Sequence, residues 1–493
     1  MRNPFKRSKP KQTLALREFQ TTVEGSESAI KQARLSPPDA SVRIALRKLR
    51  AKSREEVRQN PLGRSIILAM TNNVLGAQGI QLRSRAEAEA KKALESAWRV
   101  WGKTCGFGGI NWRSIQRQVL YSLIVDGEAF VQFGVRNGSL AVKVRDAQTI
   151  DPAQNELLPR GSSIRMGIEY TPVGEIVAYH FREPFFFGGI DGGETYQYPS
   201  SRTTERIPAN RILHIYDREV PGTTRGVPWL IPSLIAMELL RHYAESAKIA
   251  ARTAASVYGV ISNPEGEHDL TEDQLTKYTN SAKLKPGGLL FPPEGYNATI
   301  TTPTHPTTTY APFTEATHRE IAAGLGIAAH TLDGNLSGIN FSAGRIGSLN
   351  ERETFASIRQ LLVDDLHDPV FAAWLPIAFV GGLPGSLEEL ADSEFVGKAQ
   401  PHIQPREAAT ADRMYFDMKA KTLSEIIRDR GADPRDVFQE AADEIAIFEE
   451  LGLAYPTATA PPRPQPESDD DDGEESEEDS EGNNRPPAAA AGE

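Results

Sequence analysis

The chain has 493 residues, of which 39% are hydrophobic and 25% charged, and its formal net charge is -11 at pH 7. This is the composition of a folded protein of about three domains, and the single cysteine, Cys105, excludes an internal disulfide framework and a multi-thiolate zinc site. No apolar stretch approaches the ~18 residues of a membrane-spanning helix, and no apolar signal segment follows the basic start. We therefore expect the chain to work in a reducing interior, without a membrane.

Charge is distributed unevenly along the chain. Residues 457–493 contain 12 Asp/Glu and 2 Arg, whereas residues 1–60 contain 15 Lys/Arg and 6 Asp/Glu. Without the acidic tail, the chain has a net charge of -1. Free nucleic-acid binders usually carry a basic field over the folded domain, so any contact of this body with DNA should be weak or local. The dense acidic run repels itself and is expected to be disordered.

The first half of the chain is predicted to begin with helices and to continue with strands. Residues 1–40 contain no long apolar period. Apolar spacing predicts helices over Val42–Gln59, from Pro61 to a stop at Gly76, over Ala86–Trp101, and after Asn111 as the N-cap. A strand is predicted over Ala129–Val135, and β-branched and aromatic runs predict an antiparallel β region over Leu140–Tyr216.

The second half contains the longest helical pattern. It opens at Gly226-Val227-Pro228 and reaches Tyr258, and at 1.5 Å per residue about 30 residues give a rod of roughly 45 Å. An insert follows, with a short helix near 270–282 and strands near 288–291 and 298–302. The remaining predicted elements are a helix over 314–325, a polar turn over 332–338, a helix over 343–374 that Pro369 interrupts, and helices over 406–419, 423–429 and 433–451.

No nucleotide-binding or nucleophilic motif emerges from the sequence. Gly102-Lys103-Thr104 resembles the end of a Walker A motif, but Ala97 stands where the motif needs its first glycine. The neighbouring Trp98 and Trp101 predict structural packing instead. Cys105 lacks an identified base, and no G-x-S-x-G segment is present.

Metal ligands are equally weakly indicated. His305, His318, His330 and His367 do not show H-E-x-x-H spacing, which favours surface or interface histidines. Asp126 and Glu128 could bind magnesium together with Asp151, although acidic residues in a loop are more often solvated caps. We expect no cofactor and find no positive sign of an enzyme.

The order of several short segments carries more information than any single site. In chain order they are Arg58–Ile66, Asn72–Ile80, Trp98–Trp101, Asp126–Glu128, Ile207–His214, Arg225–Trp229, Ile321–Ile327, Leu336–Ser342, Arg345, Glu351–Arg352 and Leu423–Asp433. Through this series, which covers about residues 40–455, the chain resembles lambda-type phage portal proteins.

The resemblance implies an α+β portal fold with wing, stem, clip and crown regions. It also implies assembly as a closed ring of about twelve subunits around a central channel. The implied regions are a basic, mobile N-terminal arm (1–40), a wing of helices and antiparallel strands (41–225), a first stem helix (226–258), a clip (259–312), a second stem helix (313–327), a tunnel loop (328–345), a long kinked helix returning to the wing (343–399), a helical crown (400–455) and a disordered acidic tail (456–493).

The function that the resemblance implies is a vertex channel, through which double-stranded DNA is packaged into the capsid and ejected from it. The implied partners are the terminase large subunit, head–tail connector or adaptor proteins, and the major capsid and scaffold proteins. The implied location is the unique vertex of the virion, reached after assembly in the host cytoplasm.

The implied channel explains two sets of residues. A pore should not grip DNA, because each phosphate that Lys or Arg binds adds affinity. Brief contacts with DNA are expected from the tunnel-loop residues Asn335, Ser337, Asn340, Ser342 and Arg345. Arg345 is expected either to contact DNA or to bridge to a neighbouring subunit. Packing of the stem in the oligomer is expected from Leu240, Tyr243, Ala247, Ala251 and Ala254.

The chain also departs from the family pattern. Phe341 stands where relatives tend to have tyrosine, and Pro401–Pro405 replaces a Trp-Asp-Pro-like segment before the crown. The acidic tail is not carried over from the family. Two other functions stay open: a capsid scaffold or adaptor without a pore, and an ATP-driven packaging enzyme, against which the incomplete Walker A motif counts.

Overall fold

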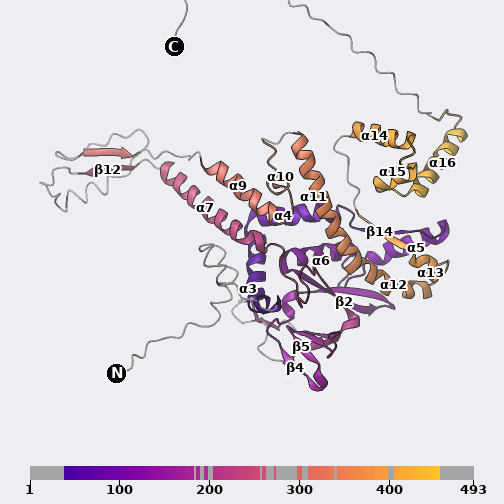
Figure 1. Ribbon diagram of the computed structural model, residues 1–493, viewed down its shortest axis with the longest axis horizontal. Coiled ribbons are helices and arrows are strands. Elements are labelled where there is room, and N and C mark those ends of the chain that lie inside the picture. Colours follow the sequence, from indigo (N-terminus) through magenta and orange to yellow (C-terminus); the bar gives the residue numbers. More distant parts are fainter. Residues whose placement is uncertain are drawn as a thin grey trace, which may run out of the picture. The chain divides into compact units, whose positions relative to one another are not determined.

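A computed structural model describes residues 38–182, 185–188, 194–197, 204–255, 258–262, 271, 273, 297–301, 309–337, 341–397 and 405–455. The described residues form two compact units (Figure 1). The first contains residues 38–422 together with 429–431, and the second contains residues 423–428 and 432–455. The expectations for residues 1–37 and 456–493 lie outside the described residues.

Helices make up most of the first unit. Their bounds are α3 (Pro38–Gln59), α4 (Pro61–Met70), the π-helix η1 (Thr71–Leu75), α5 (Ala88–Gly102), α6 (Trp112–Asp126), α7 (Ile231–Ala255), α9 (Tyr310–Ala323), α10 (Ala329–Asp333), α11 (Phe341–Leu362), the π-helix η5 (Val363–His367), α12 (Asp368–Val380), α13 (Leu387–Ala391) and α14 (Pro405–Asp417). The predicted N-cap is confirmed, because the Asn111 side chain accepts a hydrogen bond from the Ser114 amide at 2.8 Å. Asn60 caps α4 in the same way, with Pro61 at the first helical position.

The described strands of the first unit pair antiparallel with one another, as the sequence predicts for its β region. One sheet has the order β11 (Ile212–Tyr216), β2 (Glu128–Arg136), β3 (Ser139–Arg145). A second has the order β10 (Glu205–Pro208), β7 (Ile176–Phe181), β6 (Ile168–Tyr170), β5 (Ser163–Arg165), β4 (Glu156–Leu157). The remaining pairs are β1 (Gln81–Ser84) with β14 (Ser393–Val396), β8 (Phe185–Gly188) with β9 (Glu194–Gln197), and β12 (Tyr258–Ser262) with β13 (Asn297–Thr301).

A cluster of tryptophans lies in the main hydrophobic core. The rings of Trp98 and Trp101 on α5 are 4.5 Å apart between centroids, and Trp98 meets Trp374 of α12 edge-on at 5.0 Å. The Trp101 Nε1–H donates to the Leu140 carbonyl at 2.8 Å, which ties α5 to β3. The Gly102-Lys103-Thr104 segment thus ends a helix that packs into the core, and the prediction of structural packing here is confirmed.

Two predicted helices have different bounds in the structure. The long pattern that opens at Gly226 becomes helical only at Ile231. Residues 226–230, which include Gly226 and Pro228, are not helical, and we call them the approach segment. It ends at Ala255, and Tyr258 starts β12. The helix expected to continue over 343–399 ends at Val380 and is followed by α13 and β14.

The predicted irregularity near Pro369 takes the form of the π-turn η5, which separates α11 from α12, and Pro369 is the second residue of α12. The expected loop over 328–345 contains the short helix α10 and the first turn of α11. β13 confirms the strand near 298–302, whereas the helix near 270–282, apart from residues 271 and 273, and the strand near 288–291 lie outside the described residues.

The second unit is built around α15 (Leu423–Asp429) and α16 (Pro434–Glu450). Asp433 caps α16 by accepting a hydrogen bond from the Arg435 amide at 2.8 Å. α16 leaves Phe438, Ile445 and Ile447 exposed. Among the described helices of both units, none combines the length and the apolar character that crossing a lipid bilayer requires.

Candidate functional site

Residues 334–337, which follow α10 and which we call the polar segment, are held in shape by side chains within and next to the segment. Gly334 ends α10 with φ 71°, a left-handed conformation that favours glycine. The Asp333 carboxylate accepts a hydrogen bond from the Asn335 amide at 2.8 Å, and the Asn335 side chain accepts from the Ser337 amide at 2.9 Å. Two successive Asx turns therefore order this exposed segment without any apolar burial.

Helix α10 is fixed to both neighbouring helices. The Thr331 hydroxyl on α10 donates to Glu351 of α11 at 2.9 Å. His318 Nδ1 on α9 lies 2.8 Å from the Asp333 carboxylate. The buried Glu351 has its pKa raised by desolvation. The polar segment is thus anchored from α9 and α11, although its own surface is open to solvent.

The predicted DNA-contacting residues occupy different settings. Asn335 and Ser337 are exposed on the polar segment. Asn340 lies outside the described residues, and Ser342 lies in the first turn of α11. Arg345, one turn further along α11, is about half exposed and lies 3.8 Å from the carboxylate of Glu407. Contact of these residues with DNA stays a prediction.

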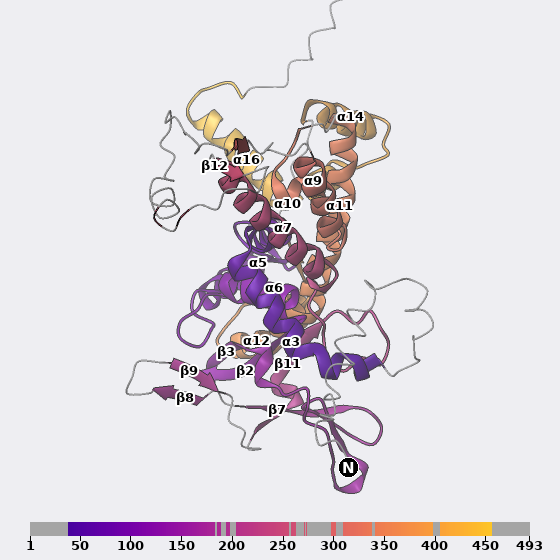
Figure 2. The same ribbon diagram turned by 90° about the vertical axis from the view of Figure 1, so that its left-hand side faces the viewer.

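One face of α7 packs against α9 of the same chain, and the two helices run side by side in both views (Figures 1 and 2). Leu240 is buried, and the Tyr243 ring meets Tyr310 and Phe313 of α9 at centroid distances of 5.6 and 4.6 Å. The Ser233 hydroxyl donates to the Ile321 carbonyl at 2.8 Å. Ala247 and Ala251 are partly exposed further along the helix. The side chain of Ala254 lies outside the described set.

The opposite face of α7 carries apolar side chains that stay partly exposed among the described residues. Ile235, Leu239 and Ile249 are 40%, 58% and 60% exposed. At 100° per residue, Leu239 and Ile249 lie about 40° to either side of Ile235, so the three form one stripe within an arc of about 80°. Sequence reasoning did not single out this stripe, because it assigned packing in the oligomer to the face that carries Leu240 and Tyr243. The packing of that face in the oligomer stays a prediction.

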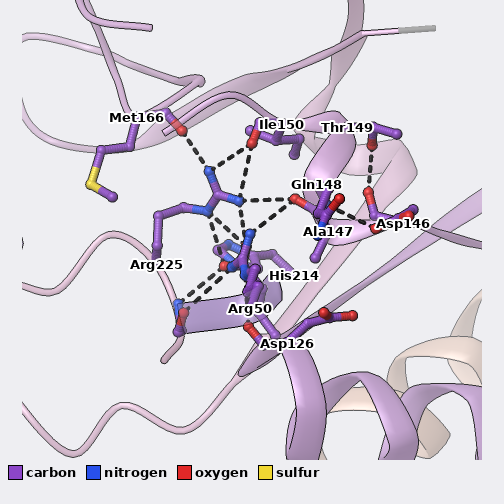
Figure 3. A network of polar contacts seen from close by, with 12 residues as sticks. Arg50, Asp126, Asp146, Ala147, Gln148, Thr149, Ile150, Met166, His214 and Arg225 are labelled. Carbon is purple, nitrogen blue, oxygen red and sulfur yellow. Dashed lines mark hydrogen bonds and ion pairs between the residues drawn. The ribbon is translucent and has the colours of Figure 1, made fainter. Parts of the chain in front are cut away.

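A buried ion cluster lies where the approach segment to α7 meets the sheets (Figure 3). Glu128, at the start of β2, accepts from Arg50 of α3 at 2.5 Å and from the Arg225 Nε–H at 2.8 Å. It also lies 2.9 Å from His214 Nε2 of β11 and accepts from the Gly226 amide at 3.0 Å. Glu128, Arg50 and Arg225 are almost completely buried. One carboxylate therefore joins a helix, two strands and the approach segment.

The guanidinium groups of the cluster also satisfy backbone carbonyls. Arg50 donates to the Asp126 carbonyl at 2.8 Å, and Arg225 donates to the Met166 carbonyl at 2.7 Å. Burial alone would raise the pKa of Glu128, but the charges of Arg225 and Arg50 outweigh it and hold this pKa well below its ordinary value. Burial lowers the pKa of His214, which stays neutral beside the two arginines.

The acidic residues considered as magnesium ligands all face arginines. Glu128 belongs to the ion cluster, Asp126 pairs with Arg54 at 2.7 Å, and Asp151 pairs with Arg47 and Arg182. Within the described residues, no three His, Cys, Asp or Glu side chains gather as a metal would require. Burial raises the pKa of the Cys105 thiol to about 12, so this side chain is a thiol at neutral pH.

His367 is buried in η5 against Trp112 and Phe395, and neither ring nitrogen has a hydrogen-bond partner in the described part of the chain. Burial lowers its pKa to about 3. In the unfolded chain this histidine binds a proton below about pH 6.5, whereas in the folded chain it binds one only below about pH 3. This residue therefore reduces stability as the pH falls through that interval.

We expect the variant His367→Phe to show a smaller loss of unfolding free energy between pH 6.5 and pH 4 than the wild type. The wild-type slope should be steeper by up to about 1.4 kcal/mol per pH unit, which is the limit for one proton. Urea unfolding at several pH values measures both slopes. Replacement of the exposed His242 serves as the control and should leave the wild-type slope unchanged. Parallel slopes for His367→Phe and the wild type would contradict the assignment.

Comparisons of the sequence with known proteins indicate one family. The model of the family described as phage portal protein, lambda family, matches residues 25–359. A probable portal protein of Halomonas phage phiHAP-1 is 25% identical over 84% of this chain and 82% of its own length. The portal protein of Escherichia phage N15 is 22% identical over 60% of this chain and 61% of its own length. A chain from the neck of an empty gene transfer agent particle is 15% identical over 84% of this chain and 100% of its own length, with a TM-score of 0.46.

Proposed function

The chain belongs to the lambda family of phage portal proteins, and from this premise we propose that about twelve copies close into a ring around a channel for double-stranded DNA. The ring would occupy one vertex of the capsid, after assembly in the host cytoplasm. There it would pass the genome inward during packaging and outward during ejection. The terminase large subunit, head–tail connector proteins, and major capsid and scaffold proteins would be its partners.

The observation that carries this proposal is the uncovered apolar stripe of α7. Ile235, Leu239 and Ile249 lie opposite the face that packs on α9, on a helix of 25 residues. Full burial of an exposed side chain of this size is worth about 1.5–3 kcal/mol, and a neighbouring subunit that covers the 40–60% still exposed would gain the corresponding part. A head-to-tail contact of this kind closes into a ring when its repeated rotation completes a full turn without a rise along the axis.

The polar segment after α10 suits the lining of the channel. Asn335 and Ser337 are exposed and uncharged, so they offer phosphates weak hydrogen bonds and release few counterions. Arg345 follows on α11 with its ion pair to Glu407. We infer that DNA moves past these residues without being held.

The regions of the chain would then divide as wing (41–225), stem around α7 and α9, clip (259–312), tunnel loop (328–345), the long interrupted helix returning to the wing, and crown (400–455). A structural role fits better than an enzymatic one. Purified protein is accordingly expected to lack ATPase activity, which would separate a portal from a packaging motor.

Replacement of Leu239 and Ile249 by glutamate is expected to abolish ring assembly, because each charge would be buried in the subunit contact. Negative-stain images and native mass measurement of the wild type should show rings with an axial hole, and those of the double variant should show single chains. Val173→Glu is the matched control, since Val173 is 87% exposed in the turn between β6 and β7 and its replacement should leave the rings intact. Wild-type single chains or filaments at every salt concentration would contradict the proposal.

A further inference from the structure

A pocket of about 450 Å³ lies among α3, α4, α6 and the end of β3. Helix α3 packs on both α4 and α6 (Figure 1). Five arginines line this pocket, which we call the arginine pocket: Arg54, Arg58, Arg64, Arg117 and Arg145. Two aspartates, Asp126 and Asp146, are the acidic residues of its lining, so the lining has a formal charge of +3.

Two of the arginines are held in place by carboxylates. Arg54 donates to Asp126 at 2.7 and 2.9 Å and to Asp146 at 2.6 and 3.2 Å. Arg145 donates to Glu205 at 2.8 Å and lies 4.5 Å above the Phe181 ring. These contacts fix two of the five arginines before any ligand arrives.

The guanidinium groups of the other three arginines, Arg58, Arg64 and Arg117, have no hydrogen bond or ion pair with the described residues. Arg58 lies one turn after Arg54 on α3, on the same face, where like charges repel. Arg64 comes from α4 and Arg117 from α6. Three separate helices thus bring positive charge to one concave place, an arrangement that an anion would stabilise.

Neutral donors complete the lining. Tyr121 follows Arg117 by one turn on α6, and Thr71 and Ser122 add hydroxyl groups. Burial, followed by the charge of Asp126, raises the pKa of Tyr121, so its hydroxyl remains a donor at neutral pH. The volume is within the range of small-molecule sites. Planar guanidinium forks with neighbouring hydroxyls match the tetrahedral oxygens of phosphate.

We propose that the arginine pocket binds phosphate oxyanions, supplied either by the backbone of a nucleic acid or by a free phosphate compound. The site is separate from the polar segment and from the α7 stripe. It therefore does not rest on the channel described above, and a failure of either proposal leaves the other intact.

The test measures binding of pyrophosphate to the full-length protein by calorimetry at constant ionic strength. Arg64→Gln and Arg117→Gln are each expected to weaken binding about tenfold or more, the effect of losing one charged hydrogen bond. Arg99→Gln, an exposed arginine on α5 outside the pocket, is the matched control and should bind as the wild type does. Thermal unfolding checks each fold, and Arg58→Gln replaces any variant that is destabilised.

Further ligands identify the source of the phosphate. A short DNA duplex that binds with the same loss in Arg64→Gln and Arg117→Gln assigns the pocket to nucleic-acid phosphates. Binding of pyrophosphate alone assigns it to a free phosphate compound, and both results support the proposal. Equal pyrophosphate affinity in the pocket variants, the control and the wild type would overturn it. So would binding of a peptide copied from the acidic residues 467–481 in the absence of pyrophosphate binding.

Discussion

Replacing Glu128 by glutamine is expected to lower the free energy of unfolding by about 3–5 kcal/mol. Glutamine keeps the shape of the side chain but removes the negative charge that Arg50 and Arg225 share. Both guanidinium groups are almost fully buried, so the variant must bury two positive charges without a counter-charge. Urea unfolding at pH 7, followed by circular dichroism, measures the loss.

The control for this variant is Glu205→Gln. Glu205 also pairs with an arginine, Arg145, at 2.8 Å, but its side chain is 42% exposed and water can replace the contact. Its loss should cost no more than about 1 kcal/mol. Equal losses of unfolding free energy in Glu128→Gln and Glu205→Gln would contradict the role of the ion cluster as a junction between the helix, the strands and the approach segment.

The difference in unfolding free energy between the wild type and Glu128→Gln should also depend on pH, in a direction that the pKa of Glu128 determines. The folded-state pKa of Glu128 lies well below its ordinary value. Its contribution to stability is therefore fully present above the unfolded value near pH 4.3, and it is lost as the pH falls through the folded-state pKa. The gap between the wild type and Glu128→Gln should stay constant from pH 7 to pH 5 and decrease only in stronger acid.

Local patterns predicted most elements because each depends on residues close in sequence. The cap at Asn111, the strand after Gly127 and the interruption before Pro369 follow from local chemistry. The start of α7 could not be placed this way. Gly226 is held by Glu128, a residue 98 positions earlier, and a contact at that separation leaves no local signal.

The candidate sites, too, could be predicted only where they depend on residues close in sequence. The polar segment with Asn335 and Ser337 was predictable, because short polar side chains and glycine indicate a turn wherever they occur. The exposed stripe of α7 was not, since both faces of this helix carry apolar or small residues and only the position of α9 distinguishes them. The acidic residues Asp126 and Glu128 suggested a metal, but their arginine partners come from distant segments.

Replacing Gly127 by alanine is expected to be among the most disruptive single substitutions in the first unit. Gly127 ends α6 with φ 84°, where any other residue costs about 1–2 kcal/mol. A Cβ atom there would also lie 2.1 Å from the Val227 carbonyl carbon and 2.5 Å from the Pro228 nitrogen. These neighbours are backbone atoms, so the approach segment itself would have to move, at a further cost of at least about 1–3 kcal/mol.

A matched control separates the two costs. Gly222 has the same φ of 84°, but a Cβ atom there would meet nothing within 4 Å. Gly222→Ala should therefore lose only the backbone contribution of about 1–2 kcal/mol in the same urea experiment. The extra loss of unfolding free energy in Gly127→Ala then measures how tightly the approach segment packs on the junction of α6 and β2. Gly226 also lies against Gly127 there. Equal losses of unfolding free energy in the two variants would mean that the approach segment can move away from an added methyl group at little cost. The ion cluster would then be the main contact that holds this segment in place.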